Sequence, residues 1–176
     1  MLAVLGEETN KIKQILNENF NNIKCYLAND NSKGQLIISG KNDELIKFSA
    51  LLKDKKIKNI KLPVSAPFHC ELMRDATNKM KKIIMEQQLF EPNYKVVSNV
   101  SAKEYKNSDE IKKLLVNQIE SPVRWRESIE YMISNGTSTF FEIGPGKVLS
   151  GLIKRINKDV KVLNIDTLED IQGISK

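Results

Sequence analysis

The spacing of apolar residues over the first 64 positions alternates between the period of a strand and the period of a helix. Ile12, Ile15 and Leu16 recur at helical spacing, whereas the segment 2–5 is an apolar run of strand length. The predicted elements are strands over 2–5, 23–28, 35–39 and 58–64, and helices over 8–19 and 42–53. Their order is βαββαβ, which is the split pattern of ferredoxin-like folds.

Polar residues suggest where some of these elements begin and end. Thr9 is a candidate N-cap for the first helix, because its hydroxyl could accept a backbone N–H of the first turn. The run from Asn29 to Gly34 is rich in turn-forming residues and predicts a break between two strands.

After position 64 the pattern changes, and longer helices alternate with strands. Helices are predicted over 71–86, from Ser108 onward, over 124–134 and over 148–156, and strands over 93–99, 139–143 and 161–165. Such alternation favours a partly parallel sheet. We therefore expect an α/β protein with one domain over residues 1–64 and a second over 65–176. Three strands make a thin sheet, so we expect the second domain to be incomplete.

Composition narrows the classes of protein to consider. The 176 residues are 40% hydrophobic and 28% charged, which is typical of a globular chain. No apolar run approaches the ~20 residues that span a membrane, and the first residues lack the basic start and cleavage site of a signal peptide. Cys25 and Cys70 lack metal-ligand spacing, and with one histidine in the chain we expect no zinc or other metal site.

The formal net charge is +6, and the lysines are concentrated in two stretches. The stretches contain Lys53, Lys55, Lys56, Lys58 and Lys61, and then Lys79, Lys81 and Lys82. These lysines form either a solvated surface or a surface for an anionic partner. Nucleic acid is a poor candidate for that partner, because no aromatic residues interleave with the lysines and no RNA- or DNA-binding motif is present. A phosphorylated ligand and an acidic protein both remain candidates for the anionic partner.

The only histidine, His69, is the strongest candidate for chemistry, because imidazole transfers protons near neutral pH. Pro63 and Pro67 restrict the backbone before it, and apolar residues at helical spacing follow it. His69 is therefore expected on a stiff segment directly before a helix. A loop histidine without any chemical role would show the same pattern.

The chain offers no obvious nucleophile for this histidine. The strand-turn-helix elbow Gly-x-Ser-x-Gly, which presents a serine in many hydrolases, does not occur. Ser150 lies within a predicted helix, Ser65 lies on an extended segment and points elsewhere, and the side chain of Cys70 diverges from its neighbour His69. The residues thus supply a candidate base without a partner.

Two polar turns are weaker candidates for ligand binding. Gly144-Pro145-Gly146-Lys147 precedes a predicted helix and could bind an anion, but its spacing is neither that of a P-loop nor that of a dinucleotide site. A tight strand-to-helix turn explains it better. Turn chemistry also explains Asn29 and Asn31, although their amides could hydrogen-bond a polar ligand.

Five segments occur in one order and are together more specific than any single motif. They are 28–35 (Ala-Asn-Asp-Asn-Ser-Lys-Gly-Gln), 62–73 around Pro-Phe-His-Cys, 97–100 (Val-Ser-Asn-Val), 118–132 beginning Gln-Ile-Glu-Ser-Pro-Val-Arg-Trp, and 142–152 around Gly-Pro-Gly-Lys. This combination resembles the C-terminal part of the malonyl-CoA:acyl carrier protein transacylases. That family has an α/β-hydrolase-like domain with an inserted ferredoxin-like subdomain, which the resemblance places at residues 1–64.

The resemblance implies a ping-pong transfer of malonyl from coenzyme A to the phosphopantetheine thiol of acyl carrier protein, in type II fatty-acid synthesis. His69 would be the general base and acid, and Gln118 matches the residue whose backbone carbonyl orients the histidine. Asn29 and Asn31 match residues along the thioester and pantetheine path. Phe68 resembles the Phe-His pair of malonyl-selective acyltransferases, where many bacterial relatives have Ser-His; it would shrink the acyl pocket.

The family comparison also sets the expected partners. Malonyl-CoA and acyl carrier protein are expected, without nucleic acid, membrane, metal or cofactor, since the coenzyme A thioester is a substrate. The full-length protein is expected to be a monomer. It would be cytoplasmic in a bacterium and plastid-located in a plastid-bearing eukaryote. The basic surfaces would suit an acidic carrier protein.

The chain departs from the family in what it omits. The serine elbow, the arginine that pairs with the malonyl carboxylate and the glutamine of the oxyanion hole would all precede the region that this chain matches. We therefore expect a fragment that is inactive alone. Two alternatives remain: an acyltransferase domain cut from a polyketide or fatty-acid synthase, and a non-catalytic remnant that only binds carrier protein.

Overall fold

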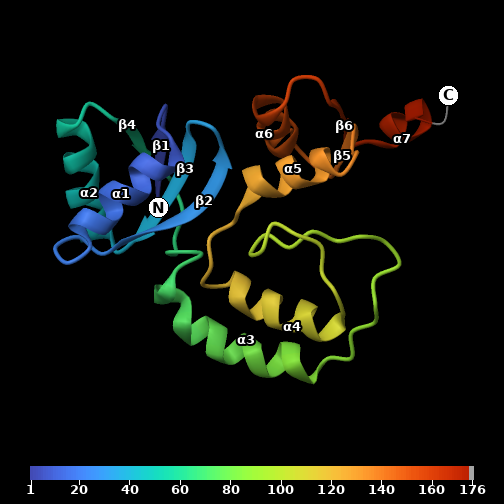
Figure 1. The fold of residues 1–176 in the computed structure, drawn as a ribbon, viewed down its shortest axis with the longest axis horizontal. Coiled ribbons are helices and arrows are strands. Elements are labelled where there is room, and N and C mark those ends of the chain that lie inside the picture. The colour runs from blue at the N-terminus through green and yellow to red at the C-terminus, as the bar shows by residue number, and fades with distance from the viewer. Residues whose placement is uncertain (175–176) are drawn as a thin grey trace. The chain divides into compact units, whose positions relative to one another are not determined.

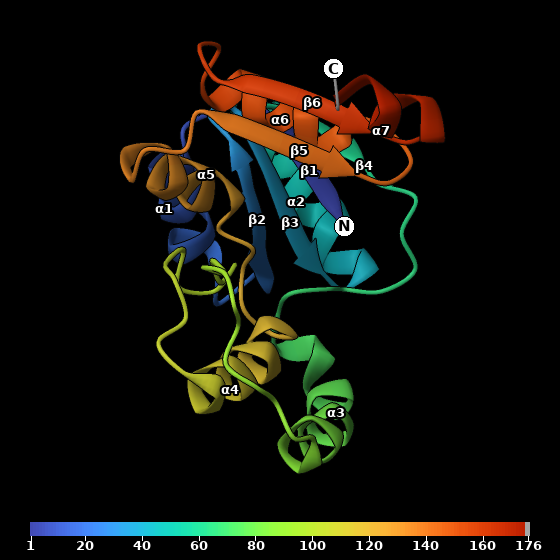
Figure 2. The same cartoon turned by 90° about the vertical axis from the view of Figure 1, so that its right-hand side faces the viewer.

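In the computed structural model, which describes residues 1–174, the predicted βαββαβ order is present in the first part of the chain. The elements are β1 (Leu2–Leu5), α1 (Thr9–Asn19), β2 (Cys25–Ser32), β3 (Gln35–Gly40), α2 (Asn42–Asp54) and β4 (Lys58–Lys61). The four strands pair antiparallel in the order β2-β3-β1-β4. Figures 1 and 2 show α1 and α2 together on one face of this sheet.

Alternation of side chains along the strands builds the main core. Leu2 and Val4 of β1 point to the same face as Leu36 and Ile38 of β3, because successive strand residues face opposite sides. The helices cover that face with apolar residues at helical spacing, which are Ile12, Ile15 and Leu16 of α1 and Leu45, Phe48 and Leu52 of α2. A smaller cluster that includes Ala3, Ala28 and Ile37 lies on the other face.

Strand β2 is longer than the sequence predicts, and the turn predicted over 29–34 is confined to Lys33 and Gly34. The strand continues to Ser32, with register shifts between Leu27 and Asn29 and between Asp30 and Ser32. Asp30 is buried and its carboxylate accepts a hydrogen bond of 3.1 Å from the Thr9 hydroxyl. Thr9 is therefore not the N-cap of α1, since Glu8 occupies that position without a side-chain cap.

The predicted strand over 58–64 ends early, at Lys61. The Leu62 N–H still donates to the Met1 carbonyl at 3.0 Å, but Pro63 has no N–H to continue the ladder. The chain therefore leaves the sheet at this point and leads toward His69.

Two helices follow His69 and lie side by side in both views (Figures 1 and 2). A short 3-10 helix, Glu71–Met73, leads into α3 (Arg74–Glu86), and α4 (Ser108–Gln118) returns along it. Asn107 caps α4 by accepting the Glu110 N–H at 2.9 Å, and the Glu110 carboxylate accepts the Lys106 N–H. This is a reciprocal capping arrangement, which fixes where α4 begins.

The strand predicted over 93–99 is wrong. Among the described residues, this segment forms only an isolated bridge between Val97 and Glu104. Tyr94 is 86% exposed and Val96 44% exposed, so these β-forming residues are not buried in a sheet.

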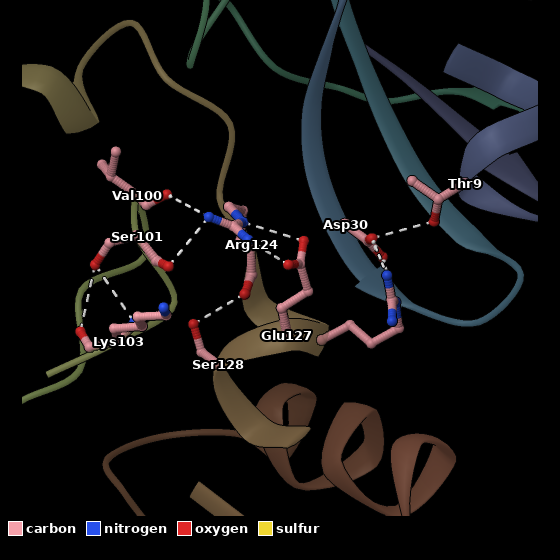
Figure 3. A network of polar contacts seen from close by, with 9 residues as sticks. Thr9, Asp30, Val100, Ser101, Lys103, Arg124, Glu127 and Ser128 are labelled. Atoms are coloured by element: carbon pink, nitrogen blue, oxygen red, sulfur yellow. Dashed lines mark hydrogen bonds and ion pairs between the residues drawn. The ribbon is translucent and has the colours of Figure 1, made fainter. Parts of the chain in front are cut away.

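The segment after α4 returns to the sheet and joins it by backbone and side-chain contacts. The Asp30 N–H donates to the Val123 carbonyl at 2.9 Å, and the Val123 N–H donates to the Ala28 carbonyl at 2.8 Å. Figure 3 shows the neighbouring Arg124 side chain between Glu127, with which it forms an ion pair, and the carbonyls of Val100 and Ser101. These contacts anchor the loop around residue 100 to the same segment.

A buried ion pair completes this connection. The Arg126 guanidinium donates to both carboxylate oxygens of Asp30, at 3.1 and 2.8 Å. The Asp30 side chain is 4% exposed and the Arg126 side chain 20% exposed, so the pair lies largely out of solvent. Paired oxygens and nitrogens in this geometry offset the cost of removing both charges from water.

The chain divides into two compact units, Met1–Ser128 and Ile129–Lys176, and α5 (Trp125–Ser134) begins in the first and ends in the second. The second unit contains β5 (Thr139–Ile143), α6 (Val148–Ile156), β6 (Lys161–Ile165) and α7 (Leu168–Ile174). Strands β5 and β6 pair in parallel, which confirms the predicted type of sheet. Helix α7 was not predicted.

We expect Asp30→Ala to lower the free energy of unfolding by about 3 kcal/mol, because the largely buried Arg126 guanidinium loses the two hydrogen bonds that it donates to the Asp30 carboxylate. Urea unfolding followed by circular dichroism would measure the change. The control is Lys47→Gln, which breaks the exposed Lys47–Glu44 ion pair and should leave the midpoint unchanged. Equal midpoints for the two variants would contradict the role assigned to Asp30.

Candidate functional site

His69 has an unusual backbone conformation, with φ at 60°. Left-handed φ values are uncommon for residues other than glycine and persist where surrounding contacts hold them. The adjacent Cys70 is buried, and its thiol donates to the Pro67 carbonyl at 3.2 Å, which closes the backbone around the histidine. The histidine is thus presented on a tightly turned segment between the extended residues after β4 and the helix that begins at Glu71.

The ring of His69 contacts the end of α4. Its Nδ1 lies 2.9 Å from the backbone carbonyl oxygen of Gln118, the last residue of that helix. A carbonyl oxygen can only accept, so this contact is a hydrogen bond when Nδ1 carries the proton of the neutral ring, and Nε2 then keeps its lone pair. The arrangement suits a group that takes up a proton at Nε2.

Two further contacts fix the residues that follow His69. The Tyr26 hydroxyl donates to the Glu71 carboxylate at 2.5 Å, which connects β2 to the 3-10 helix. Burial and this hydrogen bond both raise the pKa of Tyr26, so it stays protonated. Arg74 forms an ion pair of 2.8 Å with Glu120, which connects α3 to the turn after α4.

An open cavity of about 460 Å³ lies beside the imidazole. Its lining residues are Lys13, Leu16, Asn17 and Phe20 of α1, Cys25, Tyr26 and Leu27 of β2, and His69, Cys70, Glu71, Glu120 and Pro122. Burial raises the pKa of the Cys25 thiol to about 12, so Cys25 offers no thiolate at neutral pH.

The other residues predicted to bind substrate lie elsewhere. Asn29 and Asn31 are half-buried on β2, on either side of the buried Asp30, and Phe68 is 42% exposed. Of the described residues that line the cavity beside His69, none is Asn29, Asn31 or Phe68. Their contact with a substrate stays a prediction. Sequence reasoning missed Tyr26, Glu71, Arg74 and Glu120, whose pairing joins segments far apart in the chain.

The Gly-Pro-Gly segment forms the predicted strand-to-helix turn. Gly144 and Gly146 have φ values of 125° and 92°, which suit glycine. The Glu142 carboxylate accepts the N–H groups of Leu149 and Ser150, at 3.0 and 2.7 Å, at the start of α6. Because a carboxylate of the chain already occupies this helix end, the geometry does not favour a phosphate there.

Residues 1–174 contain no group of three or more His, Cys, Asp or Glu side chains that could hold a metal ion. In the same range, none of the helices combines the length and apolar character needed to cross a membrane.

Known proteins resemble this chain in sequence, although no protein-family model matches it. The malonyl CoA-acyl carrier protein transacylases of Bacillus subtilis and Staphylococcus aureus (strain MSSA476) are each 40% identical to it, over 98% of this chain. The matches cover 55% and 57% of those two proteins, so the chain spans about half the length of the curated relatives it matches.

Solved structures resemble it equally well. The malonyl CoA-acyl carrier protein transacylase from Clostridium perfringens has a TM-score of 0.93 and 38% identity, covering 99% of this chain and 55% of that one. A malonyl-transacylase in complex with a type II PKS acyl-carrier protein has a TM-score of 0.92 and 31% identity, covering 99% and 57%. These similarities confirm the resemblance and the α/β class predicted from the sequence. Their coverage fits a C-terminal part of such a protein.

We expect Glu142→Ala to destabilise the start of α6 by about 1 kcal/mol, because two N–H groups lose their acceptor. Amide hydrogen exchange should accelerate at Leu149 and Ser150. Lys147→Ala is the matched control, since Lys147 sits at the N-cap of α6 without a side-chain hydrogen bond. Unchanged exchange in Glu142→Ala would show that the carboxylate does not cap the helix.

Proposed function

We propose that this chain is the C-terminal part of a malonyl-CoA:acyl carrier protein transacylase of type II fatty-acid synthesis. The contact between Nδ1 of His69 and the Gln118 carbonyl carries the proposal, because it leaves Nε2 free to act as a base. Residues 1–64 would be the ferredoxin-like inserted subdomain, which their sheet order supports, and residues 65–176 part of the hydrolase-like domain.

The proposed reaction is a two-step exchange on a serine that this chain does not supply. Nε2 of His69 takes the proton of the serine hydroxyl as its oxygen attacks the thioester carbonyl of malonyl-CoA. The imidazolium then returns the proton to the departing coenzyme A sulfur, which leaves a malonyl ester. In the second step, His69 deprotonates the phosphopantetheine thiol of the carrier protein, which attacks the ester, and the serine recovers its proton.

The Gln118 carbonyl has two tasks in this scheme. It keeps the proton on Nδ1 while Nε2 is the base, and it stabilises the imidazolium once Nε2 is protonated. Neither step needs a metal or a redox cofactor, because malonyl transfer conserves oxidation state and coenzyme A enters as part of the substrate.

Three residues are proposed to contact the substrate. Asn29 and Asn31 keep part of their side chains exposed on β2, which leaves their amides available to the polar pantetheine arm. Phe68 precedes the histidine and would narrow the space for the acyl group. A single additional methyl group on that acyl chain would then be disfavoured by about 1–3 kcal/mol.

The proposed protein partner is an acyl carrier protein. One structural relative was solved in complex with such a carrier, and carrier proteins would meet a basic surface here. Lys79, Lys81 and Lys82 are all exposed on α3. We further propose that the full-length enzyme is monomeric, and that it is cytoplasmic in a bacterium or plastid-located in a plastid-bearing eukaryote.

We expect the 176-residue chain alone to gain no ester adduct with malonyl-CoA, because the proposed serine is not part of it. Intact-mass spectrometry after mixing would measure this. A stable adduct on this chain would contradict the proposed division of the catalytic residues.

A hybrid supplies the positive test. This chain would replace the matching part of the Bacillus subtilis relative, and we expect the hybrid to transfer malonyl to carrier protein. His69→Gln should lower kcat/KM by about 10²–10⁴, the usual worth of a general base. Lys95→Gln, at an exposed ion pair with Glu104, is the control. Full activity of the His69→Gln hybrid would refute the proposal.

The carrier surface can be tested in the same hybrid. Changing Lys79, Lys81 and Lys82 to Glu should raise the KM for carrier protein more than the KM for malonyl-CoA. Changing Lys53, Lys55 and Lys58 to Glu alters the net charge equally on another exposed surface and serves as the control. Similar effects of the two triple variants would count against docking at α3.

A further inference from the structure

The contact with His69 depends on the direction of one peptide group at the end of α4. The N–H groups of Ile119, Glu120 and Ser121 turn back to the carbonyls of Val116 and Asn117, at 2.9 to 3.3 Å. None of these three donors goes to the Gln118 carbonyl, which instead faces the imidazole. The direction of that carbonyl is therefore set by the turn that residues 118–121 form.

An ion pair connects this turn to the segment that carries the histidine. The Arg74 Nε–H donates to both carboxylate oxygens of Glu120, at 3.1 and 2.8 Å. Arg74 begins α3, directly after the 3-10 helix that follows His69, and Glu120 lies within the turn after Gln118. The Glu120 side chain is 19% exposed and lines the same cavity as the imidazole. The pair thus spans the two backbone segments whose separation decides the contact at Nδ1.

We propose that Glu120, through its ion pair with Arg74, is a positioning residue that holds the Gln118 carbonyl on Nδ1 of His69. This inference rests on the proposed function, in which that carbonyl selects the tautomer of the base. Glu120 touches no reacting atom in this scheme. It acts through the turn, by fixing the position of the Gln118 carbonyl oxygen relative to Nδ1 of the imidazole.

A merely structural role predicts a different outcome. Helices α3 and α4 also pack along their length, and Lys112 of α4 donates to the Met85 carbonyl at the far end of α3. If packing alone set the geometry, loss of the ion pair would lower stability and leave the imidazole proton in place. The position of that proton therefore separates the two roles.

The single histidine makes the measurement direct, because every imidazole signal of the chain belongs to His69. Long-range ¹H–¹⁵N spectra of the full 176-residue chain, at a pH where the ring is neutral, report which nitrogen is protonated. The unmodified chain should show the proton on Nδ1. In Glu120→Gln and in Arg74→Gln, the ratio of the Nδ1–H to the Nε2–H form should fall by about twofold to fivefold. The effect is modest because Arg74 is exposed and solvent screens its attraction to Glu120.

Rescue and control variants complete the experiment. Reversing the pair, with Glu120→Arg and Arg74→Glu together, should restore most of the Nδ1–H form, and Glu120→Asp should retain part of it. Lys95→Gln breaks the exposed Lys95–Glu104 ion pair and should leave the spectrum unchanged.

An unchanged tautomer ratio in both folded single variants would overturn the inference, as would an unmodified chain protonated on Nε2. If a single variant does not fold, the reversed pair and Glu120→Asp provide the test. Equal loss of the Nδ1–H form in these two variants would also overturn the inference. Acyl transfer by the hybrid enzyme is measured separately, so the proposed function can stand if this inference fails.

Discussion

The Asp30 carboxylate lies within the first unit, 4% exposed, and a charge there is tolerated because the Arg126 guanidinium meets it with two hydrogen bonds. This pair joins β2 to the start of α5 across 96 positions of sequence. Between the two residues, the chain leaves the sheet, forms α3 and α4 and returns. Because Gln118 lies at the beginning of that return, the ion pair restricts the position of the Gln118 carbonyl. It thereby also restricts the contact between that carbonyl and His69.

The partner of the histidine is a backbone carbonyl, which distinguishes this site from a triad with a buried carboxylate. A carbonyl selects the tautomer as a carboxylate does, but it brings only the partial charge of a helix end. It also has no side-chain torsion to adjust, so its direction must come from the backbone. The left-handed conformation of His69 directs the imidazole toward α4, and the turn after Gln118 directs the carbonyl toward the imidazole. The contact at Nδ1 needs both.

Local patterns predicted the elements that depend on local interactions. Strands β5 and β6 and helix α6 have the predicted bounds, because their apolar runs are interrupted by a glycine-rich turn and polar residues. The end of β2 was mispredicted because Asp30, a residue typical of turns, is held in the strand by an ion pair with the distant Arg126. Similarly, Tyr26 with Glu71 and Arg74 with Glu120 pair across 45 and 46 positions, and no periodicity encodes such pairs. His69 could be singled out by composition and motif, but its surroundings could not.

The second unit supports the proposal that the activity belongs to a longer protein than this chain. Phe141 and Ile143 of β5 are 48% and 79% exposed, although parallel strands are ordinarily covered on both faces. A sheet of two strands is also smaller than those that are stable alone. Relatives that are nearly twice as long have additional residues that could cover such a surface. The exposed sheet and the proposed role of His69 as a base are thus consistent with each other, because both call for contacts that residues 1–174 do not provide.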